Sequence, residues 1–360
     1  MASSALETLT TTGAALRADA MLSVRDLRTY FFADEGITKA VDGAFFNLYA
    51  GRTLGIVGET GCGKSVTARS ILRIVDRPGK IVSGEILLRR QNTIVDLVQL
   101  EPDGREIRQI RGGEIGLVFQ EPMTSFSPVH TVGDQIIEAI RLHLKLSHKA
   151  ARDRAIELLT NVGVGRPEGR LAEYSWQLSG GLRQRAMIAM ALAAGPKILI
   201  ADEPTTALDV TTQAQILDLL QRLQDENQMS IMFITHDLGV IAEMADDVVV
   251  MYLGRVVEQG PVDQIFHAPK HPYTQALLRS IPSVEATAKV KLPTISGAIP
   301  HPFDRPQGCP FHPRCSVAIA GTCEVVEPER VLIAPRHAVA CHQCPASMSI
   351  DREQRERARS

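Results

Sequence analysis

Short apolar runs bounded by turn residues recur along the first two thirds of the chain and predict buried strands. Residues 21–50 alternate apolar and polar positions in short runs, which favours strands joined by turns. Later runs are too short for helices, and helical patterns separate several of them, so we expect an α/β core with a largely parallel sheet. These runs cover residues 53–57, 115–119, 198–201, 231–235 and 248–252.

Helical spacing of apolar residues dominates the segments between and after these runs. Residues 65–75 follow the first run and predict a strand, loop and helix unit, while residues 131–162 are helical throughout and predict a small inserted subdomain. Two further helices are expected at 262–268 and 273–281, before a Pro-rich tract. The predicted division is a disordered N-terminus (1–20), a core domain (21–261) with a helical subdomain at about 125–190, an accessory domain (262–350) and a frayed tail (351–360).

Length and charge exclude several classes of protein. A chain of 360 residues is long enough for two or three domains. Its 39 Lys and Arg against 41 Asp and Glu argue against a nucleic-acid-binding module. The longest apolar stretch, residues 186–195, is too short for a membrane helix of about 20 residues, so the chain is not expected to span a membrane. The first 20 residues lack the pattern of a signal peptide, and secretion is not expected.

Residues 58–65, Gly-Glu-Thr-Gly-Cys-Gly-Lys-Ser, fit the phosphate-loop pattern G-x-x-x-x-G-K-[ST] between a predicted strand and a predicted helix. Its glycines let backbone N–H groups face phosphate oxygens, and the helix N-terminus adds partial positive charge. Lys64 can reach the β- and γ-phosphates, and the Ser65 hydroxyl can bind Mg²⁺. The alternative is a glycine turn with a solvated lysine. The residues predicted to bind ATP here are Gly58, Glu59, Thr60, Gly61, Cys62, Gly63, Lys64, Ser65 and Val66.

Two acidic residues end the predicted buried strand at 198–201. Asp202 is placed to orient Mg²⁺, and Glu203 is placed to polarise the water that attacks the γ-phosphate. The alternative is that the pair only caps a helix before Pro204. Together with the phosphate loop, the two acids predict a nucleoside triphosphatase.

Residues 178–185, Leu-Ser-Gly-Gly-Leu-Arg-Gln-Arg, resemble the signature motif of ATP-binding-cassette ATPases. Further motifs resemble that family in the same order along residues 22–260. The resemblance implies a P-loop cassette with a RecA-like core, an antiparallel β subdomain and an inserted helical signature subdomain. It also implies the roles of single residues: Gln120 in the Q-loop, Ala207, Leu208 and Asp209 in the D-loop, His236 as the switch histidine, Gln120, Glu203 and His236 as catalytic residues, Ser65, Gln120 and Asp202 around Mg²⁺, and Phe31, or failing it Tyr30, stacked on adenine.

The signature motif implies a dimer. In the family, this motif binds the γ-phosphate of ATP held by the other subunit, so that two cassettes close head to tail around two nucleotides. Hydrolysis removes these interface contacts and converts phosphate chemistry into motion. The residues implied to act on the partner's ATP are Leu178, Ser179, Gly180, Gly181 and Gln184.

Longer matches point to transport. Cassette ATPases of DNA repair carry a long insertion between Q-loop and signature, whereas about sixty residues without sustained heptads separate Gln120 from Ser179 here. Residues 116–128, 205–211 and 271–274 resemble the ATPases of oligopeptide and dipeptide importers. The alternatives are a nickel or glutathione importer of the same family and a soluble cassette ATPase acting on nucleic acid or ribosomes. The resemblance does not identify the peptide.

The importer family implies the partners of this chain. We expect a peripheral subunit on the cytoplasmic face of the inner cell membrane, bound to two transmembrane permease subunits through residues 123–128 and 131–140. A second, related cassette would complete a heterodimer, although one sequence leaves a homodimer open. An extracytoplasmic peptide-binding protein acts indirectly, and nucleic acid is not an expected partner.

Four cysteines near the C-terminus have the spacing Cys-x5-Cys-x7-Cys-x17-Cys: Cys309, Cys315, Cys323 and Cys341. They resemble the C-terminal extension of peptide-importer ATPases, where four such cysteines can bind an iron-sulfur cluster. Four thiolates suit either a [4Fe-4S] cluster or zinc, and free buried cysteines are the third interpretation. Cys344 is not an expected ligand. A cluster here would stabilise a segment poor in apolar residues.

Overall fold

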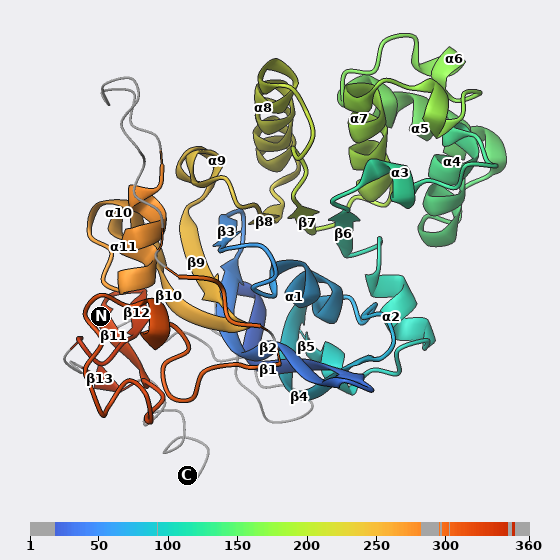
Figure 1. Cartoon of the computed structure of the whole chain (residues 1–360). Coiled ribbons are helices and arrows are strands. Elements are labelled where there is room, and N and C mark those ends of the chain that lie inside the picture. The colour runs from blue at the N-terminus through green and yellow to red at the C-terminus, as the bar shows by residue number, and fades with distance from the viewer. Residues whose placement is uncertain are drawn as a thin grey trace, which may run out of the picture. The chain divides into compact units, whose positions relative to one another are not determined.

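The computed structural model describes residues 19–91, 93–281, 295, 297–301, 303–344 and 348–349 (Figure 1). Contacts divide the chain into two compact units. Unit 1 comprises Met1–Asn47, Leu54–Val98 and Thr235–Ser360, and unit 2 comprises Leu48–Thr53 and Gln99–Ile234. Of the predicted disordered N-terminus, residues 1–18 lie outside the described residues, and Ala20 already begins a strand. The predicted tail at 351–360 also lies outside them.

The first sheet of unit 1 has the strand order β2-β1-β4-β5. Its strands are β1 (Ala20–Ala33), β2 (Gly36–Tyr49), β4 (Gly79–Arg90) and β5 (Thr93–Asp96). The β1–β4 and β4–β5 pairs are antiparallel, with Leu22 opposite Leu88. Ala20, Leu22 and Val24 are buried at period 2, and Leu27 and Thr29 continue this spacing after a register shift. This sheet has the character of the expected antiparallel β subdomain.

The second sheet of unit 1 is parallel only where it holds the phosphate loop. Strand β3 (Thr53–Val57) pairs in parallel with β9 (Asp247–Tyr252). The described pairs among the predicted buried strands are parallel, as expected, whereas beyond β9 all pairs are antiparallel and involve strands that the sequence did not predict. The reason is local: Leu253 and Gly254 have φ of 44° and 81° and form a two-residue hairpin turn. The added strands are β10 (Arg255–Pro261), β12 (His337–Ala340), β11 (Arg330–Ala334) and β13 (Met348–Ser349).

The three helices that the sequence predicts in unit 1 begin within one residue of the expected positions. Helix α11 begins at Pro272, directly after His271, whose side chain accepts a hydrogen bond from the Tyr273 N–H. The two helices expected after residue 260 are both present, within two residues of the predicted ends. The predicted accessory domain, however, clusters with the phosphate loop in one unit. The helical elements are α1 (Lys64–Ile71), α9 (Leu238–Met244), α10 (Val262–His267), α11 (Pro272–Arg279), and the 3₁₀ turns η1 (Leu97–Gln99) and η3 (His312–Arg314).

Unit 2 contains three parallel strands in the order β8-β7-β6. Strands β7 (Ile198–Asp202) and β8 (Ser230–Ile234) are buried along their whole length, and β6 (Ile115–Val118) lies beside β7. Such strands read as continuous apolar runs, which is why the sequence predicts them within one residue.

Helices α3 to α7 lie between β6 and β7 in the sequence and form one helical group (Figure 1). Helix α4 starts at a capping box in which Thr131 and Asp134 exchange side-chain to backbone hydrogen bonds. The group covers the residues for which the sequence predicts a helical subdomain. The helices of unit 2 are α2 (Arg105–Ile110), α3 (Pro122–Ser125), α4 (Val132–His143), α5 (His148–Asn161), α6 (Pro167–Arg170), η2 (Ser175–Gln177), α7 (Gly180–Ala191) and α8 (Val210–Asn227).

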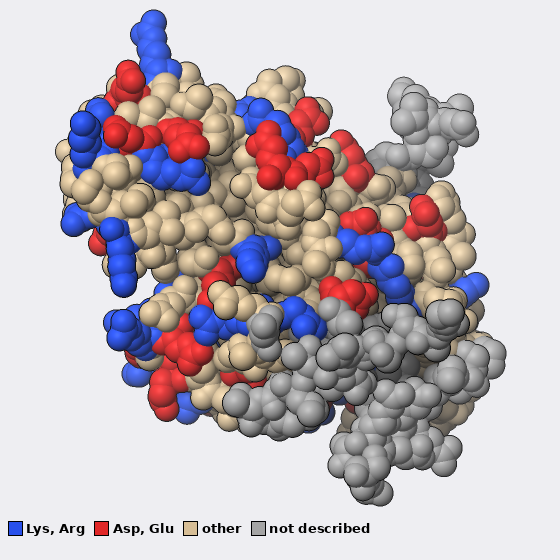
Figure 2. Space-filling view, turned by 180° about the vertical axis from the view of Figure 1, so that it is seen from behind, with Lys and Arg blue, Asp and Glu red and all other residues tan. Residues whose placement is uncertain are grey.

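Charged side chains are mixed on the surface. On the face drawn in Figure 2, basic and acidic residues are interspersed, in keeping with a net charge of −2. Among the described residues, every helix is too short or too polar to cross a membrane.

Candidate nucleotide-binding site

The phosphate loop follows β3 and precedes α1, as the sequence predicts. Two of its glycines fit tightly against backbone. A Cβ on Gly58, at φ 151°, would lie 2.2 Å from the Met251 carbonyl oxygen, and a Cβ on Gly63, at φ 103°, would lie 2.2 Å from the Ala40 carbonyl oxygen. Only glycine combines these dihedral angles with so close an approach. Gly61 also has a positive φ of 80° but faces open space, where a phosphate could approach.

The lysine of the loop is drawn inward. Lys64 is 5% exposed, and its Nζ donates hydrogen bonds to the carbonyl oxygens of Gly58 at 2.8 Å and Glu59 at 3.3 Å. Burial raises the pKa of the Cys62 thiol, which therefore stays protonated at neutral pH. The ammonium group is thus held by backbone oxygens of the loop that the sequence assigns to phosphate binding.

The other predicted residues of unit 1 are placed as follows. Phe31 is half-buried, and its ring lies against Gly79. Tyr30, the second choice for adenine, donates a hydrogen bond to Asp42 at 2.6 Å. Burial and this hydrogen bond raise the pKa of Tyr30 to about 12. His236 is exposed, two residues after the end of β8. Tyr30 is therefore engaged elsewhere, while Phe31 remains the predicted stacking residue.

The two acids of unit 2 lie at the C-terminal end of β7. Asp202 is 6% exposed, whereas the next residue, Glu203, is half-buried at a φ of 48°. Such a dihedral angle is strained for a side chain other than glycine, and strain of this kind gathers at functional sites. Glu203 Oε2 accepts hydrogen bonds from Gln120 Nε2 at 3.3 Å and Thr206 Oγ1 at 2.9 Å. The structure thus brings predicted Gln120 and Glu203 together and adds Thr206, which the sequence did not single out.

The signature segment presents the N-terminus of α7. Ser179 caps this helix by accepting the Leu182 N–H at 3.4 Å, and Ser179 and Gly180 are exposed. Leu178 is buried beneath them, and Gly181 is half-buried. Gln184 is only 2% exposed, unlike Ser179 and Gly180, and its role on the partner's ATP stays a prediction.

The D-loop leads from the acids into α8. Ala207 has a φ of 64°, and Leu208 lies beside Gly180. Asp209 caps α8 by accepting hydrogen bonds from the Thr212 hydroxyl at 2.7 Å and N–H at 2.9 Å, and these bonds lower the pKa of Asp209. The D-loop is therefore a structured helix start that lies next to the signature turn.

Comparison with known proteins shows the family of a chain with these motifs. The family model described as "ABC transporter" matches residues 41–206, and the model "oligopeptide/dipeptide transporter, C-terminal region" matches residues 257–323. A probable peptide ABC transporter ATP-binding protein of Sinorhizobium fredii is 50% identical over 90% of this chain and 95% of its own length. The chain belongs to the ATP-binding proteins of the peptide ABC transporters. Dipeptide transport ATP-binding proteins of Haemophilus influenzae and Escherichia coli are 49% and 45% identical, each over 90% of this peptide transporter ATPase.

Solved cassettes share the fold of the peptide transporter ATPase. The dimeric ABC transporter cassette MJ0796 is 28% identical, with a TM-score of 0.59 over 67% of this chain and 99% of its own. A post-hydrolysis structure of MJ0796 bound to ADP and Pi matches equally well. ATP hydrolysis is thus an activity of the family to which this chain belongs.

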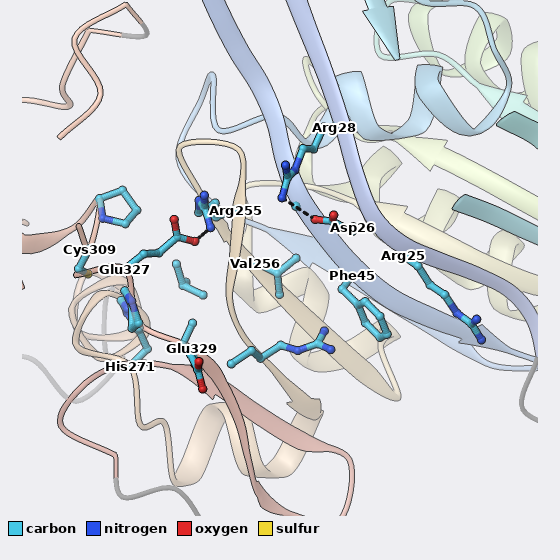
Figure 3. A pocket seen from close by; sticks show the side chains of 16 residues that line it. Arg25, Asp26, Arg28, Phe45, Arg255, Val256, His271, Cys309, Glu327 and Glu329 are labelled. Carbon is cyan, nitrogen blue, oxygen red and sulfur yellow. Dashed lines mark hydrogen bonds and ion pairs between the residues drawn. The ribbon is translucent and has the colours of Figure 1, made fainter. Parts of the chain in front are cut away.

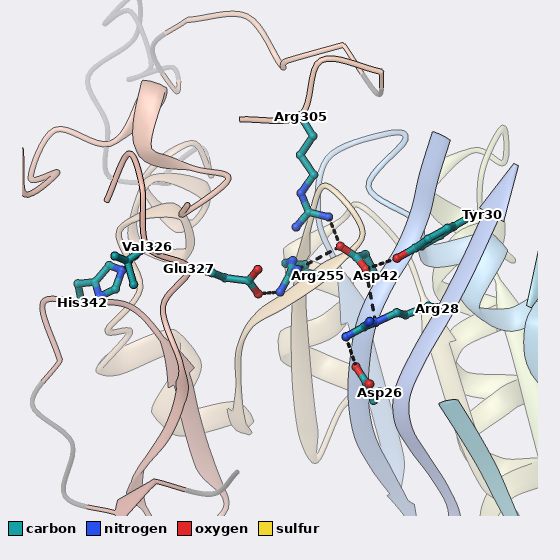
Figure 4. Close-up of polar contacts among 9 residues, drawn as sticks. All are labelled: Asp26, Arg28, Tyr30, Asp42, Arg255, Arg305, Val326, Glu327 and His342. Atoms are coloured by element: carbon teal, nitrogen blue, oxygen red, sulfur yellow. Dashed lines mark hydrogen bonds and ion pairs between the residues drawn. The ribbon is translucent and has the colours of Figure 1, made fainter. Parts of the chain in front are cut away.

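A buried carboxylate in β2 organises a cluster that the sequence did not reveal (Figure 4). Asp42 is 5% exposed and accepts hydrogen bonds from Tyr30, Arg255 at 3.1 Å and Arg305 at 2.6 Å. Burial alone would raise the pKa of Asp42, but the hydrogen bond from Tyr30 and the two guanidinium charges outweigh it and lower the pKa. Burial and repulsion from Arg255 lower the pKa of Arg305 to about 10. The cluster ties the C-terminal part of the peptide transporter ATPase to the first sheet.

A cavity of about 550 Å³ opens beside this cluster (Figure 3). Several arginines line it, but acidic side chains already face them: Arg28 is paired with Asp26 at 3.1 Å, and Arg255 with Glu327. The Arg330 guanidinium carbon lies over the ring of Phe45, which also lines the cavity, 3.8 Å from the ring centroid. Among the described residues that line this cavity, none belongs to the predicted nucleotide-binding set.

The four predicted ligand cysteines line a single small cavity of about 10 Å³. Burial raises the pKa of Cys309, Cys315 and Cys341, the last to about 12. Within the part of the chain that the structure describes, no three His, Cys, Asp or Glu side chains are already arranged as ligands of one metal ion. The structure therefore gathers the thiols without forming a finished metal site.

Proposed function

We propose that this chain binds and hydrolyses ATP as one of two cassettes that drive an importer of dipeptides or oligopeptides. The observation that carries this proposal is the exposed Ser179-Gly180 turn at the N-terminus of α7. The first N–H groups of a helix have no intrahelical partners, and they attract anions. A γ-phosphate held by a second cassette satisfies them, so each nucleotide is enclosed by two chains.

Within one chain, the residues divide the work on ATP. Lys64 and the N–H groups of the loop bind the β- and γ-phosphates, and Phe31 stacks on adenine. The hydroxyl of Ser65, the amide of Gln120 and the carboxylate of Asp202 are oxygen donors of the kind that Mg²⁺ prefers. These three groups would hold Mg²⁺, which would neutralise charge on the phosphates.

Hydrolysis depends on Glu203. Its carboxylate acts as the general base for the attacking water, and the hydrogen bonds from Gln120 and Thr206 hold it in place. His236 completes the site as the switch histidine. The strained φ of Glu203 fits this role, because the backbone at Glu203 turns its carboxylate away from the strand while Asp202 stays buried.

Apolar side chains left at the surface of unit 2 support docking on permease subunits. Met123, Val129 and Trp176 are 55%, 73% and 57% exposed. A β-bridge between Thr131 and Tyr174 brings the Trp176 segment beside the segment that precedes α4. Exposed apolar residues of this kind mark interaction surfaces. We place the contact with the permeases here, with the chain peripheral on the cytoplasmic face of the membrane and a related cassette as its partner.

The test is reconstitution of the complete transporter. The chain is coexpressed with its two permeases and the second cassette, purified as a complex and placed in lipid with the peptide-binding protein. ATP turnover should rise when the binding protein carries a dipeptide or oligopeptide, with Ni²⁺ and glutathione as comparison substrates. Stimulation of the isolated chain by DNA, RNA or ribosomes, without any response to peptide, contradicts the proposal.

We further propose that Cys309, Cys315, Cys323 and Cys341 hold a [4Fe-4S] cluster, with zinc as the alternative metal. The support is their common cavity and the chemistry of four thiols, which both groups accept. The four thiols belong to separate loops that meet at this cavity. The cluster would supply cross-links between these loops and no redox step.

Metal analysis and absorption spectra of anaerobically purified protein test this assignment. Cys323→Ser should lose iron and the broad absorption near about 400 nm that thiolate-bound clusters give. Cys344→Ser, which removes a neighbouring thiol outside the predicted set, should keep both. A folded wild-type protein that contains neither iron nor zinc excludes the proposal.

A further inference from the structure

The outer side of the phosphate loop is held by a residue from the cysteine-rich region. Arg314 lies at the end of η3, between Cys309 and Cys315, and is separated from Glu59 by 255 positions in the sequence. Its two terminal nitrogens donate to the two carboxylate oxygens of Glu59, at 2.7 Å and 3.0 Å. The Arg314 side chain is 4% exposed. Bidentate pairs of this kind are strong and fix the orientation of both groups.

The same loop residue is also held through its backbone. The Glu59 N–H donates to the hydroxyl of Tyr273 in α11 at 2.9 Å, and Tyr273 is fully buried. Arg314 in turn donates to the Tyr252 hydroxyl at 3.3 Å. The rings of Tyr252, Tyr273 and Phe311 contact one another, with centroids 4.7 to 5.4 Å apart. Backbone and side chain of Glu59 are therefore both fixed by groups that follow residue 250.

Charge gives this contact a consequence for nucleotide binding. Glu59 is the only acidic residue of the loop at 58–65. An unpaired carboxylate there would repel the phosphates that the loop is proposed to bind, and this repulsion is strongest at short range. Arg314 neutralises Glu59 and, at the same time, holds the strand-proximal half of the loop in one position.

We propose that Arg314 is a positioning residue for ATP, which sets the affinity of the phosphate loop through Glu59. The inference rests on the proposed role of this loop, and it assigns to the cysteine-rich region an effect on nucleotide binding. Arg314 itself touches neither the nucleotide nor the attacking water.

Another ion pair offers a matched control. Arg336, in the turn between β11 and β12, pairs with Asp247 at the start of β9. Asp247 lies opposite Leu54 at the beginning of β3, whereas the phosphate loop follows the other end of that strand. Arg336→Gln therefore removes an ion pair between the C-terminal region and the sheet that carries β3, without touching the phosphate loop.

The test measures ATP affinity of the full chain with a fluorescent ATP analogue, and KM and kcat for ATP in the assembled transporter. Arg314→Gln should raise Kd and KM about 10-fold or more, because charged hydrogen bonds to the loop are lost, and leave kcat within about twofold. Arg336→Gln should leave Kd unchanged. Arg314→Lys, which keeps the charge but not the bidentate geometry, should fall between wild type and Arg314→Gln.

A double-mutant cycle shows whether Arg314 acts through Glu59. In a Glu59→Gln background, Arg314→Gln should have no further effect on Kd, and the double variant, which lacks both charges, also serves if Arg314→Gln alone does not fold. Additive effects of the two substitutions, or an Arg314→Gln protein that binds ATP as tightly as wild type, overturn the inference. If wild type and Lys64→Ala bind ATP equally poorly, the assignment of the loop itself fails instead.

Discussion

Replacing Gly63 with alanine tests how the phosphate loop is built. A Cβ at this position would lie 2.2 Å from the Ala40 carbonyl oxygen, and real Cβ atoms essentially never approach closer than 3.0 Å. The carbonyl would have to retreat by about 0.8 Å, but it belongs to strand β2 and cannot move freely. The positive φ of 103° adds strain that any side chain would suffer.

Gly61→Ala separates these two costs. Gly61 shares the positive φ, at 80°, but nothing lies within 4 Å of its added Cβ. The free energy of unfolding of Gly61→Ala should fall only by the dihedral cost of about 1–2 kcal/mol. That of Gly63→Ala should fall by this amount and by roughly a further 1–3 kcal/mol from the forced contact. At about 2–4 °C per kcal/mol, Gly63→Ala should melt about 2–12 °C below Gly61→Ala.

Thermal unfolding followed by circular dichroism measures this difference in stability. A measurement of ATP affinity tests the open side of the loop separately. The methyl group of Gly61→Ala points into the open side of the loop, so this variant should keep most of its stability but lose ATP affinity. Equal melting temperatures for the two variants would refute the steric reasoning.

Three further predictions concern the acids and the docking surface. Glu203→Gln should still bind ATP but hydrolyse it about 10²- to 10⁴-fold more slowly, as measured by phosphate release, because a general base is lost. Asp42→Asn should be less stable at pH 7, since Arg305 loses the anion that it contacts and Arg255 keeps only Glu327 as a described acidic partner. Because the folded pKa of Asp42 lies below its usual 3.8, its contribution is present above that value and is lost as the pH falls through the folded pKa. Urea unfolding should therefore show the wild-type advantage shrinking below about pH 4, and an advantage constant down to pH 2 contradicts this. Met123→Glu should weaken copurification with the permeases while basal ATP turnover of the isolated chain stays unchanged; unchanged copurification argues against the proposed contact.

Features governed by neighbouring residues were predictable from the sequence. Strand β3, the glycine loop and the start of α1 form one local unit, and their boundaries depend on glycine and on an apolar run of five residues. Strands β7 and β8 are apolar throughout and short, which leaves little choice of structure. The resemblance to cassette ATPases rests on motifs of this local kind.

Contacts between distant segments were not predictable in the same way. Strand β12 pairs with β10 across about eighty intervening residues, and no periodicity in the sequence signals such a partner. Asp42 sits in an alternating strand where an apolar residue would also fit, so only its partners from distant segments, Tyr30, Arg255 and Arg305, explain it. Gln184 has the spacing of a signature residue, but the turn of helix α7 directs it into the core.

The phosphate loop is constrained from three sides, so ATP binding in the loop should affect the segments that hold it. The Ala40 carbonyl oxygen of β2 and the Met251 carbonyl oxygen of β9 limit the glycines, and Arg314 holds Glu59. Coupling between two sites is reciprocal: if Arg314 raises the affinity for ATP about 10-fold, bound ATP stabilises the contact with Arg314 by the same 1.4 kcal/mol, roughly. ATP should therefore slow hydrogen exchange in η3 as well as in the loop, and the Glu59→Gln substitution should abolish the effect in η3 alone.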